Sequence, residues 1–355
     1  MAGRPSTERP TLADVARAAG VSTGTASKAL NGRLDIAEDT RARVLEAVAA
    51  LGYRPTTAQW EPPRTRTIAA VTDVVDSPYV SNVLQGLLAA AMTAQTDVLV
   101  RLAPDRAVRA TKAAAQAWVS EQKESGVVGI VGITLSRPNA VLQAARKVGM
   151  PFVMIDPVDV DDPRTVSVGS ANWAGARTAT EHLLELGHRR IGWIGGPAAS
   201  AAARERFHGY RAALDSAGIS LDRTLVRSDP FSIETGLVHG RELLALPAAP
   251  TGIVAGDDEI AVGVIAAARE LGVPVPGRLS VVGFDDTPQA AWTTPQLTSV
   301  HQPLAGMGRM AVETVLVMAD GVEPASRHVQ LATSLTVRDS TAPPAAVAGT
   351  GPARR

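Results

Sequence analysis

The stretch VSTGTASKALNG, residues 21–32, gathers small hydroxyl side chains, one glycine and one lysine within a single short predicted helix. Large apolar residues are nearly absent from it, so burying a wide core face is not its purpose. Small side chains let a partner approach closely, hydroxyls bind phosphate oxygens, and a lysine reaches phosphate or guanine. These residue types favour contact with nucleic acid, although Gly24, in the middle of this helix, costs roughly 1 kcal/mol relative to alanine.

Two further predicted helices position this stretch. The first, TLADVARAAG, begins at Thr11, whose hydroxyl can form a capping box with Asp14, and it ends at Gly20. Ser22 can cap the second helix, and a third follows at residues 38–53, EDTRARVLEAVAALGY. Three short helices with a tight turn between the first two predict a helix-turn-helix, whose second helix enters the major groove of DNA. A small structural three-helix cap is the alternative.

From Ile68 onward the pattern changes to alternating strands and helices. Apolar, β-branched segments such as TIAAVTDVV, GVVGIVGI and LSVVGFDD alternate with helical ones such as VSNVLQGLLAAAM. Buried parallel strands separated by helices predict an α/β body in which both faces of each sheet are covered. About 270 residues are long for one such sheet, so we expect two lobes with a ligand at the carboxyl ends of the strands.

Charge and composition limit the function classes. The chain of 355 residues has 35 basic and 35 acidic side chains. Up to Arg66 the basic side chains exceed the acidic ones by about three, and a mildly basic head on an acidic body is compatible with nucleic-acid binding. The absence of cysteine excludes disulfides and thiolate nucleophiles. The N-terminus lacks the apolar core of a signal peptide and no segment reaches ~18 apolar residues, so we expect a cytoplasmic protein without a membrane partner.

The run TLADVARAAGVSTGTASKALNG, followed by TRARVLEAVAALGYRP, closely resembles the DNA-binding head of the lactose-repressor/galactose-repressor (LacI/GalR) family of bacterial transcriptional regulators. Blocks of the body resemble the same family in order, among them HLLELGHRRIGWIGGP, RERFHGYRAAL, GDDEIAVGVIAAARELGVPVPGRLSVVGFDD and PQLTSVHQP. Through this family they resemble the periplasmic sugar-binding proteins. The resemblance implies a small all-α helix-turn-helix head and a two-lobed α/β body of the periplasmic-binding-protein type, with Rossmann-like parallel sheets and three crossings between the lobes.

The resemblance also implies the boundaries of these parts. In chain order they are a disordered N-terminus at 1–10, the head at 11–56, a hinge or linker at 57–66, an effector-binding and dimerisation body at 67–338, and a disordered tail at 339–355. Within the body, it implies a first lobe of about 67–166 and 299–327 and a second lobe of about 167–298 and 328–338.

DNA contacts are carried over from the family position by position. Thr23 and Gly24 take its variable base-reading positions. The full set that the resemblance implies is Thr11, Ser22, Thr23, Gly24, Thr25, Ser27, Lys28, Asn31, Tyr53 and Trp60.

Three residues depart from the family pattern in the head. Gly24 offers no side chain for base reading, which then passes to Thr23 and Lys28. Lys28 stands where the family has arginine, and it lacks the planar fork that binds guanine through two hydrogen bonds. Ala37 replaces the serine that usually caps the third helix, so that cap falls to Asp35 or to nothing.

The linker YRPTTAQWEPPRTRTIAAV also departs from the family. There a hinge helix inserts a leucine pair into the minor groove. This linker is about two residues shorter and has no leucine, and Pro62-Pro63 interrupts it. Trp60 is the large apolar side chain available as a wedge, and packing against the head or body is its alternative role.

The ligand cleft is carried over in the same way. The arginine of RERFHGY, Arg206, matches one that grips ligand hydroxyls or carboxylate, and its fixed donors suit either. Asp257 adds negative charge where the family commonly has Asn or Ser, which argues against an anionic ligand. The implied effector-binding residues are Tyr79, Asp156, Arg206, Phe231, Asp257, Asp285 and Gln302. Carboxylates, an arginine and aromatic rings in one cleft are typical of sugar binding. Helix caps, an ion pair and core packing are their alternative roles.

Competing functions have weaker support. No G-x-S-x-G, Walker or G-x-G-x-x-G motif occurs, so we expect no enzyme and no cofactor. His182, Glu185 and His188 have metal-like spacing, but Gly187 ends their helix before His188, and we expect no metal. A stand-alone solute-binding protein would have a signal peptide and no head.

These observations predict a ligand-responsive transcriptional repressor. We expect a homodimer to present two heads to the half-sites of a pseudo-palindromic operator in double-stranded DNA. A small-molecule effector, most simply a sugar, would bind between the lobes and change operator affinity. An activator or a constitutive regulator of the same fold remains the alternative, because sequence shows binding architecture and not the sign of regulation.

Overall fold

The computed structural model describes residues 10–30, 33, 36–53, 66–105, 111–158 and 162–345. The chain divides into two units, Met1–Arg64 and Thr65–Arg355, and the division falls within the predicted linker. Asn31, Trp60, Asp35, the linker up to residue 65 and both predicted disordered ends, apart from residues 10 and 339–345, lie outside the described residues.

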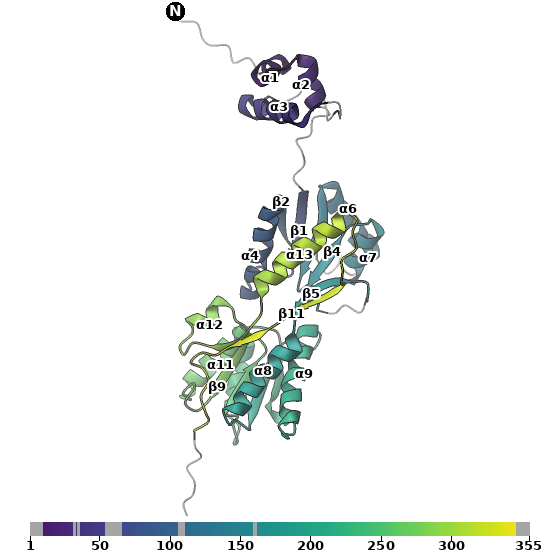
Figure 1. Cartoon of the computed structure of the whole chain (residues 1–355). Helices are drawn as coiled ribbons and strands as arrows, with labels where there is room; N and C mark the ends of the chain where they lie inside the picture. The colour runs from purple at the N-terminus through teal and green to yellow at the C-terminus, as the bar shows by residue number, and fades with distance from the viewer. Residues whose placement is uncertain are drawn as a thin grey trace, which may run out of the picture. The chain divides into compact units, whose positions relative to one another are not determined.

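The described part of the first unit forms three helices (Figure 1), which are α1 (Leu12–Ala19), α2 (Thr23–Leu30) and α3 (Glu38–Leu51). Thr11 and Asp14 form the predicted capping box, and Gly20 ends α1 in the left-handed conformation at φ 66°. Val15, Ala26 and Val44, one from each helix, are buried in a common core. Ala37 provides no side-chain cap for α3.

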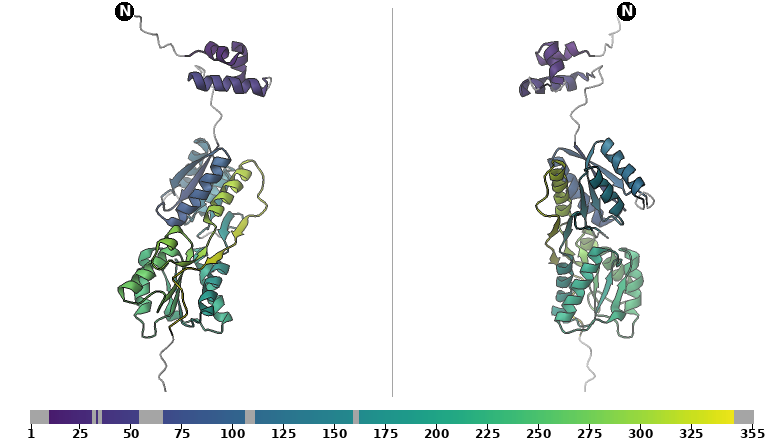
Figure 2. Two further views of the ribbon diagram at one scale, coloured as in Figure 1. Left: turned by 60° about the vertical axis from the view of Figure 1, so that its left-hand side comes forward. Right: turned by 90° about the vertical axis from the view of Figure 1, so that its right-hand side faces the viewer.

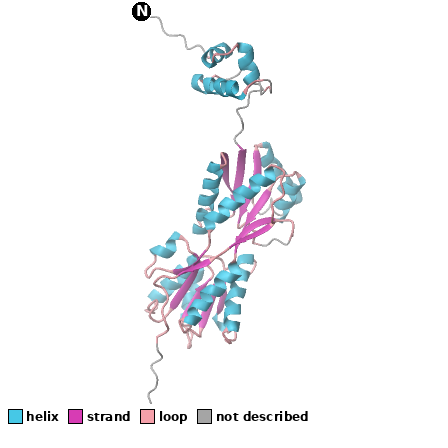
Figure 3. Ribbon diagram, in the orientation of Figure 1, coloured by secondary structure: helices cyan, strands magenta, loops and turns pink. Residues whose placement is uncertain are grey.

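The second unit contains two six-stranded sheets that define two lobes (Figures 2 and 3). The first sheet has the order β11-β5-β4-β3-β1-β2 and the second β12-β10-β9-β8-β6-β7. All neighbouring strands are parallel except β10 and β12. The strands are β1 (Arg66–Thr72), β2 (Thr96–Leu102), β3 (Val127–Ile133), β4 (Phe152–Ile155), β5 (Val166–Ser170), β6 (Ile191–Gly195), β7 (Val226–Ser228), β8 (Gly252–Ala255), β9 (Ser280–Asp285), β10 (Thr298–His301), β11 (His328–Leu331) and β12 (Ser334–Thr336).

Helices cover both faces of each sheet, as the alternating sequence pattern predicts (Figure 3). In the first lobe α4 and α13 cover one face and α6 and α7 the other. In the second lobe α10 and α11 cover one face and α8 and α9 the other. The helices within the described residues of the body are α4 (Pro78–Thr93), α6 (Lys112–Glu124), α7 (Asn139–Lys147), α8 (Asn172–Glu185), α9 (Ala201–Ser216), α10 (Ile233–Leu244), α11 (Asp258–Glu270), α12 (Pro288–Trp292) and α13 (Leu304–Ala319), with a 3-10 turn at Arg223–Leu225.

Helices α4 and α13 touch backbone to backbone in the first lobe. A Cβ atom at Gly86 would lie 1.9 Å from the carbonyl oxygen of Ala305, and one at Gly308 would lie 2.1 Å from that of Val83. Only glycine permits this approach, so the pair fixes α13 against the lobe.

The chain crosses between the lobes three times within the described residues, as predicted, but each expected boundary is a few residues early. Strand β5 pairs with β4 and β11 pairs with β5, so both belong to the first lobe. Strand β10 pairs with β9 and belongs to the second lobe. The crossings therefore lie near Ala171, at residues 302–303 and at residues 332–333, because each strand completes its own sheet before the chain leaves.

The expected disordered tail also begins too early. Ser340 is fully buried; its hydroxyl donates to the carbonyl oxygen of Val281 at 2.6 Å and accepts from the backbone N–H of Thr298 at 2.8 Å. Ala342 donates its backbone N–H to the hydroxyl of Ser280 at 3.1 Å. Residues 339–342 thus extend the second lobe, because their polar groups satisfy the ends of β9 and β10.

Candidate functional site

The exposed face of α2 is the first candidate site. Ala26 and Ala29 are the buried residues of α2, and their small side chains hold it close to the other two helices. Thr23, Gly24 and Lys28 are exposed. The face thus offers a hydroxyl, bare backbone and an ammonium group, which together suit a polyanion with a hydrogen-bonding edge.

The start of α2 is held by a local cap. The hydroxyl of Ser22 accepts from the backbone N–H of Thr25 at 3.0 Å and lies 2.8 Å from the hydroxyl of Thr25. Helix α2 starts at Thr23, so Gly24 is its second residue and does not lie in its middle as the sequence suggested. Within 4 Å a Cβ atom at Gly24 would meet one described atom, the Ser22 hydroxyl at 3.8 Å, so the head itself does not require glycine there.

Several other predicted DNA-contacting residues have different surroundings in the described part of the head. Tyr53, which follows α3, is 9% exposed and packs in the core of the head. Thr11 caps α1, with its hydroxyl 2.7 Å from Asp14. Ser27 is half-buried. Asn31 and Trp60 lie outside the described residues.

The second candidate site is a cavity of about 420 Å³ between the two lobes. It lies at the carboxyl ends of both sheets, where parallel α/β folds bind ligands. Asp156 follows β4 of the first lobe, whereas Asp257 and Asp285 lie at the ends of β8 and β9 of the second. The predicted residues that line it are Tyr79, Asp156, Arg206, Phe231, Asp257 and Asp285. Gln302 does not line the cavity, but its side-chain amide donates a hydrogen bond to Asp285, which does.

Arg206 is the centre of this site and is 3% exposed. Its Nε donates to the side-chain oxygen of Asn172 and its Nη1 to the carbonyl oxygen of Gly256, both at 2.7 Å. Nη1 also lies 3.4 Å from the carboxylate of Asp285. The guanidinium carbon lies 3.9 Å from the ring centre of Phe284 and 5.9 Å from that of Phe231. Among the described residues Nη2 makes no hydrogen bond, so one donor group remains for a ligand.

Asp285 connects this centre to a crossing between the lobes. The side-chain amide of Gln302 donates to Asp285, and the hydroxyl of Ser170 donates to the Gln302 amide oxygen. Gln302 lies in the crossing at 302–303, and Ser170 ends β5 just before the crossing near Ala171. Burial raises the pKa of Asp285 well above its usual value, and the guanidinium of Arg206 opposes that rise.

A tyrosine–carboxylate pair forms the wall on the first lobe. The hydroxyl of Tyr79, at the start of α4, donates to Asp156 at 2.7 Å. Asp156 adopts a left-handed backbone at φ 41°, which turns the chain after β4. Burial raises the pKa of Asp156, although the hydrogen bond from Tyr79 lowers it.

Asp257 both caps a helix and faces the cavity. Its carboxylate accepts the backbone N–H of Ile260 at 2.8 Å, which satisfies the first turn of α11. Burial raises the pKa of Asp257 to about 7, and the Ile260 hydrogen bond opposes the rise. The neighbouring Asp258 points away from the cavity, where it accepts from Thr287 and Ser299.

The charge of the cavity is strongly one-sided. Among the described residues that line it, one guanidinium, that of Arg206, accompanies five carboxyl groups, which are those of Asp76, Asp156, Asp257, Glu259 and Asp285. Carboxylates accept hydrogen bonds from ligand hydroxyls, and Phe231 offers an apolar face. The arrangement therefore suits a neutral polyhydroxylated ligand, and among the described residues it offers an anion only one guanidinium.

Sequence reasoning missed three residues of this site. Asn172 and Ser170 lie at the β5–α8 crossing, and Phe284 stacks more closely on Arg206 than the expected Phe231 does. A buried asparagine at the first turn of a helix, in SANW, is the one signal that the sequence offered. The sequence pattern around Phe284 predicts a buried strand residue, and it gives no sign of the contact with Arg206.

The histidines with metal-like spacing have other partners. The ring nitrogens of His188 lie 2.9 Å from the hydroxyl of Thr251 and 3.0 Å from that of Ser280. His182 lies 3.0 Å from the hydroxyl of Thr341. In the part of the chain that the structure describes, no group of three or more His, Asp or Glu residues could hold a metal ion. Nor does any helix among these residues combine the length and apolarity needed to cross a bilayer.

Comparisons with known proteins match both units. Residues 11–56 match a family described as bacterial regulatory proteins of the lacI family. Residues 180–341 match a periplasmic binding protein-like domain. The transcriptional regulator CelR of Thermobifida fusca is 33% identical over 340 residues, which are 94% of this chain and 98% of CelR. The regulator MalR of Streptomyces coelicolor is 31% identical over 93% of this chain and 96% of its own.

Solved structures of transcriptional regulators are also similar to this chain. A transcriptional regulator CelR–cellobiose complex is similar with a TM-score of 0.70 and 30% identity, over 94% of this chain and all of that one. The lac repressor dimer bound to operator and the anti-inducer ONPF is similar with a TM-score of 0.77 and 25% identity, over the same shares.

Proposed function

The chain belongs to the lacI family of bacterial regulatory proteins, and we propose that it is a repressor whose operator affinity depends on a sugar in the cleft between its lobes. It is a DNA-binding transcriptional regulator by family. The finer assignment, to repression and to a sugar effector, is our proposal. Relatives described as regulators and as repressors both match it over most of their length.

One observation carries the proposal. The cavity takes walls from both lobes, with Tyr79 and Asp156 on one side and Arg206 on the other. A ligand that touches both walls favours one relative position of the lobes over another. The chain reaches the body through the first lobe, where β1 begins at Arg66, so a movement of that lobe can reach the linker.

The charge of the cavity supports an uncharged sugar. Five carboxyl groups around Arg206 accept hydrogen bonds from hydroxyls and disfavour phosphates and sugar acids. A similar regulator has been solved with cellobiose, which is a neutral disaccharide. In this proposal the carboxyl groups bind hydroxyls and carry out no reaction.

We also propose a homodimer that acts on chromosomal DNA in the cytoplasm. The similar lac repressor binds its operator as a dimer. Two-fold symmetry would place two copies of α2 on the half-sites of a pseudo-palindrome. Thr23, Gly24 and Lys28 are the residues that we expect at the base edges, because they form the exposed face of α2.

The test begins with selection of bound sequences from random duplex DNA by the full-length protein. The enriched duplex is then titrated in the presence of neutral mono- and disaccharides, cellobiose among them, and of sugar phosphates as the anionic control. We expect a pseudo-palindromic site and its release by at least one neutral sugar. The Arg206→Lys variant, which keeps the charge but loses the fork, should bind the operator and respond more weakly.

Three results would contradict parts of the proposal. If no DNA site were enriched, the claim that the head binds a specific sequence would be lost, and a solute-binding role would remain. If the sugar made operator binding tighter, it would act as a co-repressor or in activation, and it would not release the protein from the operator. Release by sugar phosphates alone would overturn the neutral effector.

A further inference from the structure

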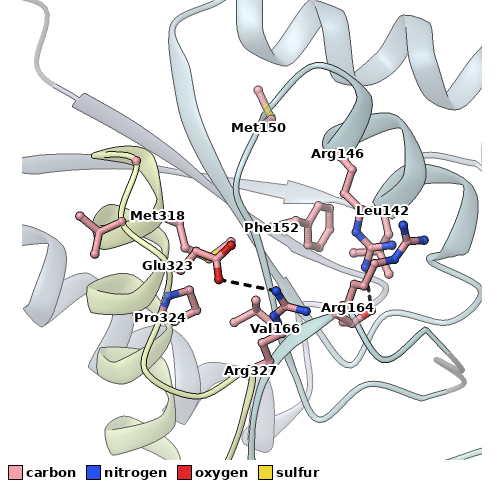
Figure 4. Close-up of a pocket in the computed structure, with 13 residues that line it drawn as sticks. Leu142, Arg146, Met150, Phe152, Arg164, Val166, Met318, Glu323, Pro324 and Arg327 are labelled. Carbon is pink, nitrogen blue, oxygen red and sulfur yellow. Dashed lines mark hydrogen bonds and ion pairs between the residues drawn. The ribbon is translucent and has the colours of Figure 1, made fainter.

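A second cavity lies at the opposite end of the first lobe from the cleft. Phe152 and Val166, which line it, begin β4 and β5, whereas Asp156 of the cleft follows the end of β4. Strands β1, β3, β4 and β5 are parallel, so this is also the end at which β1 begins at Arg66. Figure 4 shows this cavity, whose volume is about 330 Å³.

The floor of the cavity is apolar. Leu142 comes from α7, Phe152 from β4 and Met318 from α13, and Met150 and Val166 complete the floor. In Figure 4 the ring of Phe152 lies between Arg146 on one side and Glu323 on the other. A flat apolar group of a ligand would contact this floor.

Three arginines from separate segments surround the floor, and the cleft with its single arginine has the opposite composition. Arg146 belongs to α7, Arg164 precedes β5 and Arg327 precedes β11. Among the described residues that line this cavity, Glu323 is the one that carries a carboxylate.

Two of the arginines are fixed in place by a carboxylate behind them. Asp162 accepts from Arg146 and from two nitrogens of Arg164, at 3.1 Å for Nε and 2.9 Å for Nη2. Arg146 also donates to the hydroxyl of Thr165 at 3.2 Å. Two guanidiniums share one carboxylate, so their side of the cavity keeps a net positive charge in a preorganised position.

The third arginine has a weak partner. Arg327 lies 3.6 Å from Glu323, which is beyond hydrogen-bond distance, and the side chains are 48% and 87% exposed. Exposed pairs of this kind are worth little. A ligand carboxylate could therefore replace Glu323, which would turn into solvent.

We propose that this cavity binds an organic anion with a flat apolar body, such as an aromatic carboxylate, at a site separate from the sugar cleft. Its carboxylate accepts from Arg327, the net positive charge of the arginine pair on the other side attracts it further, and its ring lies over Phe152.

The site also reaches the segment that anchors the start of β1. Met318, Gly321 and Val322 line the cavity at the end of α13. Between them Asp320 lies 3.0 Å from Arg66, which also donates to the carbonyl oxygen of Leu316 at 3.3 Å. A ligand there contacts the turn that holds the first residue of β1.

The test is a titration of benzoate into the full chain at pH 7, followed by calorimetry and by ligand-observed NMR. Benzamide, which has the same shape without the charge, is the matched probe. We expect saturable benzoate binding and benzamide binding that is weaker by about tenfold or more, since hydrogen bonds to charged groups are the stronger ones.

Two pairs of variants locate the site. Arg327→Gln should weaken benzoate binding about tenfold or more. Arg211→Gln should not, although Arg211 is also half-exposed and lies 3.5 Å from Asp215 in a pair of the same spacing. Val322→Asp should weaken binding by like-charge repulsion, whereas Val337→Asp should not; these valines are 57% and 59% exposed.

Each opposite result overturns the proposal. Equal binding of benzamide would show an apolar patch that does not select anions. Benzoate binding that survives both Arg327→Gln and Val322→Asp would place the anion elsewhere, and absence of saturable binding would remove the site. Because none of these variants touches the cleft, failure here leaves the sugar response of the proposed function unaffected.

Discussion

The face of α2 and the cleft between the lobes hold their polar groups in opposite ways. On α2 the side chains of Thr23 and Lys28 are exposed, and alanines hold the helix to the head. In the cleft, Arg206, Asp257 and Asp285 are buried and tied to one another or to backbone. An exposed cation suits a long polyanion whose attraction depends on salt, whereas buried, preorganised groups suit a small neutral ligand.

This difference has an energetic consequence. Removing a buried charge leaves its partners unpaired in a poorly solvated site, so substitutions in the cleft should destabilise the fold as well as alter binding. Substitutions on α2 should change DNA binding and leave the body intact. Variants of the cleft and of the head should therefore differ in their effects on stability and on DNA binding.

The Arg206→Ala variant should lose about 3–5 kcal/mol of unfolding free energy in the body, because Asn172, Gly256 and Asp285 lose the buried group that they share. Denaturant unfolding followed by tryptophan fluorescence measures it, since Trp118, Trp173 and Trp193 lie in the body. The control Arg211→Ala, at an exposed pair, should lose less than about 1 kcal/mol. Equal losses of unfolding free energy in the two variants would show that the contacts of Arg206 stabilise the fold no more than an exposed ion pair does.

The Asp257→Asn variant should flatten the pH dependence of stability. The folded pKa of about 7 lies above the ordinary value of 3.8, so the folded state holds a proton that the unfolded state releases between these values. Stability from this group is therefore present below about pH 4 and lost as pH rises through 7, on the order of 2–4 kcal/mol in total.

Asparagine caps a helix as well as aspartate does, so this variant keeps the start of α11. We expect equal stability of variant and parent near pH 4, and a more stable variant at pH 8, in urea unfolding at each pH. An unchanged difference across that range would mean that Asp257 is ionised throughout.

The Lys28→Ala variant should weaken binding to the selected operator by about 1–3 kcal/mol, which is the range of a side chain that reads a base. Lys112→Ala, at an exposed position of the body, is the matched control. Tryptophan-detected unfolding of the body should not change in either. Equal loss on operator and on random DNA would assign Lys28 to phosphate rather than to bases.

The smallest effect concerns the head alone. Thr11→Ala removes the capping box with Asp14 and should cost about 1 kcal/mol of helix stability. Amide hydrogen exchange in α1 of the full chain measures it, with Thr23→Ala, which removes an exposed hydroxyl that caps nothing, as the control. Equal exchange in both variants would show that the box does not hold α1.

The same contrast explains what the sequence could predict. The head was predicted in detail because its determinants are local: Thr11 and Asp14 are three residues apart, and Ser22 caps the helix that follows it. Two positions there were not foreseen, the packing of Tyr53 in the core and the place of Gly24 at the start of α2, because they depend on how three helices pack together and where α2 starts.

The cleft was predicted only as a set of residues that a family resemblance supplied. Its network joins residues far apart in sequence, such as Asn172 with Arg206 and Ser170 with Gln302, and no local pattern reveals them. The arginine cavity escaped for the same reason, since Arg146, Arg164 and Arg327 meet only in the folded sheet. The lobe boundaries shifted because strand pairing, rather than composition, decides where β5 and β10 belong.

In the proposed mechanism, sugar binding in the cleft and operator binding by the face of α2 are thermodynamically coupled. The most direct measurement titrates the releasing sugar into the full-length protein by calorimetry, with and without saturating operator. Coupling is reciprocal, so operator should weaken sugar binding by the same factor by which the sugar weakens operator binding, typically about 5- to 150-fold. Equal sugar affinity in both titrations would contradict the account, because the two sites would then be independent.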